Sequence, residues 1–170
     1  MRLLPLVAAA CCALALAAPA SSAVLLGNPG DVRHSAAAEP ERERFLVPLR
    51  GRWESGFGPR WGRMHSGVDI SVLGDARVRA AASGTVVASG WLDQHWGYGL
   101  VVKIRHRPGL VTMYAHLSAS AVRRGERVER GDRIGTAGCT GSCTGTHLHF
   151  EVHRRGRAVD PKPYLRGKLR

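Results

Sequence analysis

The run Gly145-Thr146-His147-Leu148-His149-Phe150-Glu151-Val152 is the most informative in the chain, because apolar and polar side chains alternate along it. Alternation with a period of two predicts a β-strand with one buried face. Leu148 and Phe150 then face the core, whereas His147 and His149 project side by side from the opposite face. The run therefore predicts both a β fold and a place where two imidazoles lie together.

Similar runs, rich in valine and isoleucine and separated by glycine-marked turns, occur on the N-terminal side of this strand. They span residues 67–72, 84–88, 100–104 and 111–117. Alternation with regular turn signals favours antiparallel sheets over βαβ units, so the expected fold class is all-β. Residues 118–122 are interpreted as a brief helical turn. Segments 78–86 and 128–135 resemble each other, each with a glycine-marked turn between short strands, as a duplicated β motif would have.

Composition limits the kind of protein that this chain can be. The chain has 170 residues, 44% hydrophobic and 22% charged, which indicates one ordinary domain and excludes a collagen-like, coiled-coil or wholly disordered chain. The formal net charge is +12, and nearly all of the positive charge is arginine. Such a surface favours anionic partners such as nucleic acid, acidic lipid or cell-wall polymers.

The N-terminal residues have the pattern of a targeting segment. A short positive region, an apolar run and small residues at a cleavage position predict a secretory signal peptide over residues 1–23. A transmembrane anchor and a lipoprotein signal are the weaker alternatives. The chain has no second apolar run of spanning length, so we expect a secreted protein (periplasm, cell wall or extracellular) without stable membrane insertion after cleavage. Residues 24–44 are interpreted as a linker or N-terminal arm.

Cleavage near residue 20 or 23 leaves two cysteines, Cys139 and Cys143. An even pair in an exported protein predicts a small structural disulfide loop. The alternative is a pair of thiolates on a metal ion, for which the nearby histidines are better suited.

Histidines supply the chemistry that the spacing predicts. His65 and Asp69 provide two candidate zinc ligands, and one of His147 and His149 a third, which leaves its neighbour over an open coordination position. Three protein ligands and a water are the arrangement of a catalytic zinc site. His116 lies in another apolar run and is a further candidate. Each pattern alone is common in proteins without metals, but together they favour a metal site.

Three motifs closely resemble those of the lysostaphin/LytM-type zinc metallopeptidases. They are Met64-His65-Ser66-Gly67-Val68-Asp69-Ile70, Tyr114-Ala115-His116-Leu117-Ser118 and the run 145–152. The resemblance covers residues 45–165 and leaves a basic C-terminal tail at 166–170. It implies antiparallel sheets in a duplicated hybrid motif, with a groove over one zinc ion. It also implies hydrolysis of stem or cross-bridge peptides in bacterial peptidoglycan.

The resemblance also implies roles for individual residues. The zinc ligands would be His65, Asp69 and His149. His116 and His147 would handle the zinc-bound water and the developing oxyanion, with the water pKa lowered to about 7 by the metal. Which of the two is the general base stays open, with a preference for His147 because it neighbours a ligand on the same strand face.

Several nearby residues have two interpretations or a plain one. Glu151 either orients a ligand histidine or is a surface carboxylate. His106 and His153 are interpreted as solvent-facing. His95 lies in an aromatic, glycine-bearing turn that either edges the substrate groove or, as the favoured interpretation, is a surface loop. The family usually has Ser-Thr-Gly-Pro before the final histidine pair, whereas residues 143–146 read Cys-Thr-Gly-Thr. We hypothesise that the cysteine ring supplies the rigidity that the missing proline would give.

The favoured function is a monomeric, secreted zinc metalloendopeptidase acting on peptidoglycan. The runner-up is a non-catalytic wall-binding or hydrolase-activating module on the same fold, which would have lost one or more of the five site residues. A nucleic-acid partner is not expected, because the chain is predicted to be exported and has no recognisable nucleic-acid motif. The arginine pairs at 123–124 and 154–155 either bind anionic wall polymers or are simply solvated.

Overall fold

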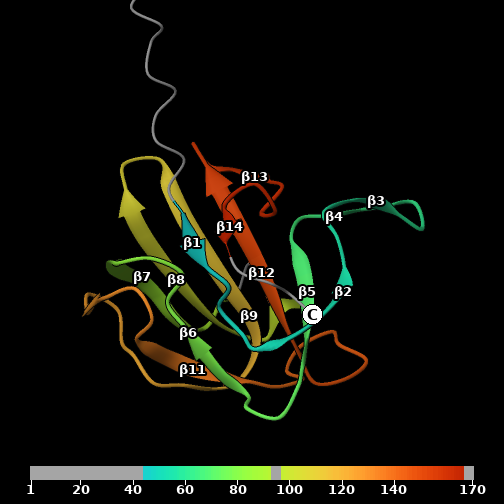
Figure 1. Cartoon of the computed structure of the whole chain (residues 1–170), viewed down its shortest axis with the longest axis horizontal. Coiled ribbons are helices and arrows are strands. Elements are labelled where there is room, and N and C mark those ends of the chain that lie inside the picture. Colours follow the sequence, from blue (N-terminus) through green and yellow to red (C-terminus); the bar gives the residue numbers. More distant parts are fainter. Residues whose placement is uncertain (1–43, 93–96, 167–170) are drawn as a thin grey trace, which may run out of the picture. The chain divides into compact units, whose positions relative to one another are not determined.

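The computed structural model describes residues 44–92 and 97–166, which form fourteen β-strands and no α-helix (Figure 1). The strands are β1 (Phe45–Leu46), β2 (Gly51–Ser55), β3 (Gly58–Arg60), β4 (Arg63–His65), β5 (Val68–Val72), β6 (Arg77–Arg79), β7 (Gly84–Trp91), β8 (Leu100–Arg107), β9 (Leu110–Ser120), β10 (Arg127–Val128), β11 (Arg133–Ala137), β12 (His147–Arg154), β13 (Arg157–Val159) and β14 (Leu165–Arg166). The predicted signal peptide, the arm before residue 44 and the tail after residue 166 lie outside these residues. No described helix is long and apolar enough to cross a membrane.

The main sheet has the strand order β10-β7-β8-β9-β12-β5-β2. All of its pairs are antiparallel, which confirms the predicted fold class. Among the strands of residues 44–92 and 97–166, the one parallel pair is β1 with β14, where Phe45 N–H donates to the carbonyl of Tyr164. This pair joins the first and last strands of the described residues.

The two similar segments at 78–86 and 128–135 form a reciprocal arrangement. The first contains β6 and the start of β7, and the second the end of β10 and the start of β11. β6 pairs with β11 and β7 pairs with β10, so each segment pairs with both strands of the other. The duplicated motif that the sequence predicts is therefore built by exchange of strand partners.

The helical turn expected at 118–122 is wrong. β9 continues to Ser120, because Ala119 and Ser120 pair with Thr136 and Gly135 of β11. Pairing with a neighbouring strand supplies the backbone hydrogen bonds that an isolated turn would have made within itself.

The core is formed by alternate residues of the central strands, whose side chains point to one face of the sheet. Leu148, Phe150 and Val152 of β12 are fully buried, as their alternation with polar residues predicts. Tyr114 of β9 is also fully buried, and its ring packs 5.3 Å from that of Phe150. This packing leaves the opposite face of β12 free to build a polar site.

Candidate metal centre and active groove

The strand order brings the site residues together. β12 lies between β5 and β9, and His149 is directly opposite Asp69 on one side and Ala115 on the other. His147 lies two residues earlier on the same face of β12, and His65 ends β4 just before β5 begins. Residues up to 84 positions apart in the chain are thus neighbours across three strands.

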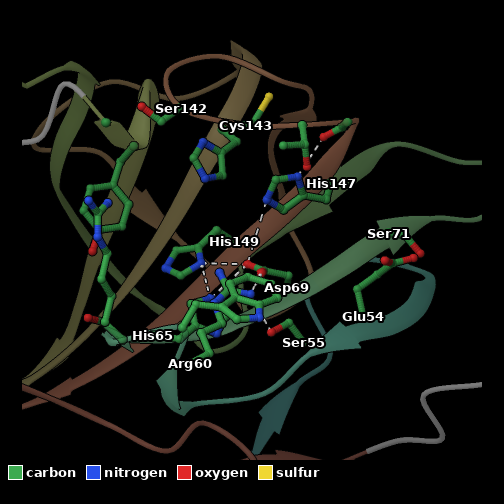
Figure 2. A pocket seen from close by; sticks show the side chains of 18 of the residues that line it. Glu54, Ser55, Arg60, His65, Asp69, Ser71, Ser142, Cys143, His147 and His149 are labelled. Atoms are coloured by element: carbon green, nitrogen blue, oxygen red, sulfur yellow. Dashed lines mark hydrogen bonds and ion pairs between the residues drawn. The ribbon is translucent and has the colours of Figure 1, made fainter.

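Three side chains converge on one point at the base of the groove (Figure 2). His65 Nε2 lies 3.2 Å from Asp69 Oδ1 and 3.1 Å from His149 Nδ1, and the last two atoms are 2.8 Å apart. The three residues are buried, and they form the group that could hold a metal ion among the described residues. They are the three that the sequence nominates as ligands.

The outer hydrogen bonds of the two histidines point their lone pairs inward. His65 Nδ1–H donates to the carbonyl of Gly56 at 2.6 Å, and His149 Nε2–H donates to Glu151 Oε1 at 3.0 Å. A neutral imidazole has one N–H, so the inward nitrogens are both acceptors beside the Asp69 carboxylate. Three acceptor atoms cannot form hydrogen bonds with one another, whereas all three can coordinate one divalent cation. A set of two imidazoles and one carboxylate suits zinc.

A proton can occupy the same place as the cation, and the local pKa values show this. Burial alone would lower the pKa of His149, but hydrogen bonds to Asp69 and Glu151 raise it above the usual value for histidine. Burial alone would raise the pKa of Asp69, but the bond and charge of His149 outweigh it and hold that pKa well below its usual range. The centre is therefore built to hold positive charge.

Arg60 occupies the outer oxygen of the aspartate. Its Nη1 donates to Asp69 Oδ2 at 3.2 Å and to Ser55 Oγ at 2.6 Å. Oδ2 is thereby engaged, which leaves Oδ1 to face the histidines. Residue spacing along the sequence did not indicate this contact.

Glu151 is a buried partner of the site and not a surface carboxylate. It is 1% exposed and accepts hydrogen bonds from His149, from the Tyr98 hydroxyl at 2.8 Å and from His153 Nε2. Burial would raise its pKa, but the bonds from the two histidines dominate and lower it to about 2. The solvent-facing interpretation of His153 is wrong, because its Nε2 is bonded to this buried carboxylate. The alternation of 147, 149, 151 and 153 on one strand face was the signal that could have placed it.

His116 and His147 face each other above the metal centre, with ring centroids 4.7 Å apart. His147 Nδ1–H donates to the Gly145 carbonyl at 2.7 Å, and His116 Nδ1–H donates to the Thr140 carbonyl at 2.8 Å. Each Nε2 is therefore free to accept a proton, and that of His147 lies 3.8 Å from Asp69 Oδ1. Burial lowers the pKa of His116 below the usual value for histidine; the hydrogen bond to Thr140 opposes this shift, and the neighbouring histidines add to it.

His116 reaches the groove through an irregular backbone. β9 has an extra residue against β8 between the pairs Leu100↔Leu117 and Val102↔Tyr114, and His116 there adopts a φ of +58°. A bulge of this kind re-aims a side chain, and a positive φ is costly for a residue other than glycine. Such strain is concentrated at functional sites.

The groove has two walls that come from different parts of the chain. One is the β3–β4 hairpin, which contributes Arg60, Trp61, Arg63 and Met64, and the other is the loop 142–146 with Gly97 and Tyr98. Figure 1 shows the hairpin extending away from the main sheet. Trp61 at its turn is 91% exposed. The open groove can accept an extended chain across the metal centre.

Two other histidines lie away from this centre or outside the described residues. His106 is half-buried, with its nitrogens bonded to the Ser83 carbonyl and the Thr112 hydroxyl, so the solvent-facing interpretation is wrong. His95 lies outside the described residues. Tyr98 lines the groove and was not singled out from the sequence.

A family model for peptidase family M23 matches residues 63–161, which include His65, Asp69, His116, His147 and His149. The chain belongs to this family. The match confirms the resemblance read from the three motifs, because the lysostaphin-type enzymes are among its structural neighbours.

Curated relatives of this M23 chain include both hydrolases and an activator. It is 46% identical over 125 residues to an uncharacterized metalloprotease of Haemophilus influenzae, covering 69% of this chain and 26% of the relative. It is 36% identical to the peptidoglycan DD-endopeptidase ShyA of Vibrio cholerae, covering 69% and 28%. It is 35% identical to the murein hydrolase activator EnvC of Escherichia coli, covering 82% and 30%. The chain thus spans less than a third of each of these relatives.

Solved structures share the fold. A zinc-containing peptidase from Vibrio cholerae matches with a TM-score of 0.64 and 34% identity, covering 76% of this chain and 41% of that one. The catalytic domain of lysostaphin from Staphylococcus simulans matches with a TM-score of 0.61 and 33% identity, covering 67% and 91%. In the second match, this chain therefore covers nearly the whole of the lysostaphin catalytic domain.

Proposed function

We propose that this M23 chain is a secreted zinc metalloendopeptidase that hydrolyses peptide bonds in bacterial peptidoglycan. The observation that carries the proposal is the convergence of three candidate metal ligands beneath two imidazoles whose Nδ1 atoms are bonded to backbone carbonyls. His65, Asp69 and His149 would hold the zinc, and His116 and His147 would move the protons. The relative that is named as a peptidoglycan DD-endopeptidase supplies the substrate class.

The chemistry divides between the metal and the two free histidines. When bound, zinc lowers the pKa of a coordinated water and polarises the scissile carbonyl. The Nε2 of His147 or His116 takes a proton from the attacking water and later passes it to the leaving amine, so one C–O bond forms and one C–N bond breaks. Their backbone partners, the carbonyls of Gly145 and Thr140, hold each ring with Nε2 toward the groove. Both rings are thereby held in the tautomer in which Nε2 can accept a proton.

The test is mass spectrometry of purified peptidoglycan incubated with the zinc-loaded mature protein. We expect new peptide termini, which identify the bond cleaved and which disappear with a chelator and in His149→Ala. His106→Gln, at a histidine outside the groove, is the matched control and should leave the product pattern unchanged. Intact peptidoglycan with a folded, zinc-loaded protein would contradict the proposal.

A hydrolase-activating module is the second candidate function, and the similarity to EnvC favours it. The same experiment separates the two when a peptidoglycan amidase is added to the reaction. Faster amidase cleavage without new peptide termini from the chain alone would support the activator. New termini from the chain alone support the peptidase.

Two further features belong to the proposal. The predicted signal peptide at 1–23 would export the chain to the compartment that contains peptidoglycan. The net charge of +12 would hold it on anionic wall polymers by long-range attraction, which salt screens.

A further inference from the structure

We propose that Thr140 is a positioning residue for His116, and that the Cys139–Cys143 disulfide keeps it in place, so that full peptidase activity requires the oxidised cysteines. This inference rests on the proposed function for its activity readout. Its structural part concerns the chain alone and can be tested without any substrate.

The first step is the contact between Thr140 and the imidazole. The Thr140 carbonyl accepts the Nδ1–H of His116 at 2.8 Å. Because a carbonyl can only accept, this bond selects the tautomer that leaves Nε2 as the proton acceptor facing the groove. His116 has a positive φ, so its position depends on surroundings that hold it there.

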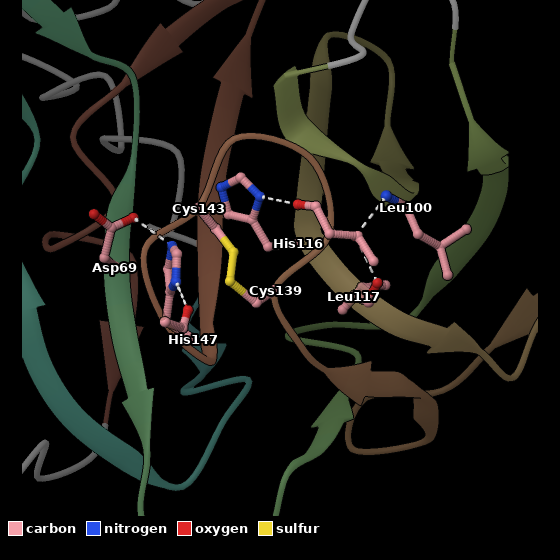
Figure 3. The surroundings of a disulfide bond; sticks show 9 residues. Asp69, Leu100, His116, Leu117, Cys139, Cys143 and His147 are labelled. Atoms are coloured by element: carbon pink, nitrogen blue, oxygen red, sulfur yellow. Dashed lines mark hydrogen bonds and ion pairs between the residues drawn. A yellow bond between two sulfur atoms is a disulfide. The ribbon is translucent and has the colours of Figure 1, made fainter.

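The second step is how the Thr140 side chain is held. Its hydroxyl accepts the Leu100 N–H at 2.9 Å and donates to the Leu117 carbonyl at 2.7 Å (Figure 3). These partners belong to β8 and β9 and are opposite each other in the strand pair that bounds one end of the bulge containing His116. The Thr140 hydroxyl thus links its loop to the bulged part of β9 that contains His116.

The third step is the ring that closes over Thr140. Cys139 and Cys143 flank the segment 140–142 and are joined by a disulfide, with their Cα atoms 5.5 Å apart. Within the ring, Ser142 N–H donates to the Gly97 carbonyl at 2.8 Å. Gly141 and Gly99 have φ values of +72° and +65°, and a side chain at either would clash with the facing segment. The ring is therefore packed directly against the chain segment before β8.

The metal ligands do not lie on this loop. His65, Asp69 and His149 belong to β4, β5 and β12, and their strand pairs with β3, β5 and β12 involve no residue of the segment 139–146. A loss of the disulfide should therefore loosen His116 without weakening zinc binding. This separation distinguishes positioning of His116 from a general structural role.

The redox step is a two-electron exchange with a dithiol reductant. The S–S bond breaks, Cys139 and Cys143 each gain a proton as thiols, and the reductant becomes a disulfide. The loop between Gly138 and His147 then loses the disulfide that closes it, and alternative conformations of Thr140 become accessible.

The test compares the oxidised and the reduced zinc-loaded protein, with Cys139→Ser/Cys143→Ser as the reductant-insensitive control. A positioned base contributes about 10²- to 10⁴-fold to rate, so we expect kcat to fall at least about tenfold on reduction, with KM and zinc affinity nearly unchanged. Nitrogen NMR of the His116 ring should change from the Nδ1–H tautomer to a mixture. Thr140→Val should give the same changes in oxidised protein, and Thr140→Ser should restore the wild-type values.

Each outcome separates this inference from the proposed function. Equal kcat and an unchanged His116 tautomer in the two redox states would overturn the inference while leaving the peptidase intact. No cleavage by the oxidised protein would remove the proposed function, but the tautomer measurement would still test the positioning. A fall in zinc affinity together with kcat would also overturn the inference, because it would show a general loss of structure. If the double serine variant does not fold, reduced wild-type protein and the Thr140 pair provide the same test.

Discussion

Glu151 is a buried carboxylate on β12 that is hydrogen-bonded to His149, a residue of the candidate metal centre on the same strand. It accepts hydrogen bonds from His149, from the Tyr98 hydroxyl and from His153. The bond to His149 Nε2 determines that Nδ1 faces the metal position. Partners of this kind fix both the tautomer and the orientation of a ligand histidine.

Replacement of Glu151 by Gln should weaken zinc binding. The amide carries no charge, and it presents two N–H groups to a place where the carboxylate only accepts. We expect zinc affinity to fall by about 10- to 100-fold, as measured by competition with a chromophoric chelator. Glu129→Gln, at an exposed carboxylate, is the control, and equal affinities for the two variants would refute this role for Glu151.

At the scale of elements, β9 is held in the core by the hydroxyl of Tyr114. This oxygen accepts the Ala81 N–H at 2.8 Å and the Thr112 hydroxyl at 3.1 Å, so it links β9 to the segment after β6. Burial raises the pKa of Tyr114 to about 12. The same strand carries His116 two residues further along.

Tyr114→Phe should destabilise the protein by about 1–3 kcal/mol, because the buried Ala81 N–H loses its acceptor. Since the folded-state pKa lies above the unfolded value near 10, the wild-type phenol stabilises the fold below pH 10, and this contribution is lost as the pH rises toward 12. Denaturant unfolding from pH 8 to 12 measures both effects. Tyr164→Phe, at a half-buried ring, is the control and should retain the alkaline loss; an identical pH dependence in Tyr114→Phe would contradict the assignment.

The β3–β4 hairpin forms one wall of the groove and presents an exposed aromatic ring. Trp61 is 91% exposed, and the Arg60 guanidinium lies 5.3 Å from its ring centroid. Since the ring is hardly buried, Trp61→Ala should change the free energy of unfolding by less than about 0.5 kcal/mol. We expect KM for peptidoglycan to rise while kcat changes little, since the ring lies on the wall and not at the centre. Trp91→Ala, at another exposed tryptophan that does not line the groove, is the comparison, and equal KM values would refute a substrate contact.

At the scale of the whole molecule, the candidate metal centre joins β12 to the consecutive strands β4 and β5, because His149 is 84 positions from His65 and 80 from Asp69. A ligand that binds only the folded state adds stability, by about 2.7 kcal/mol at a concentration one hundred times its Kd. For a domain of this size, zinc at that excess should raise Tm by about 10 °C in calorimetry. His149→Ala should show no rise, and a similar rise in that variant would place the zinc elsewhere.

Local pattern was sufficient to predict the kind of fold. The alternation in 145–152 marks a strand with one buried face, and its apolar residues are in the core. The duplicated turns at 78–86 and 128–135 likewise predict a repeated motif, since their likeness is local. The helical turn at 118–122 failed because its backbone partners lie on β11, which no local pattern specifies.

The same contrast holds for the site. Motif order nominated the three residues that converge and the two histidines above them, since each motif is a short run whose residue types are visible in the chain. Only the tertiary structure could show that β12 lies between β5 and β9, that a bulge turns His116 into the groove, and that His153 and Tyr98 meet Glu151. The physical reason is that strand pairing and burial depend on partners far away along the chain, whereas alternation and turn signals depend on neighbours alone.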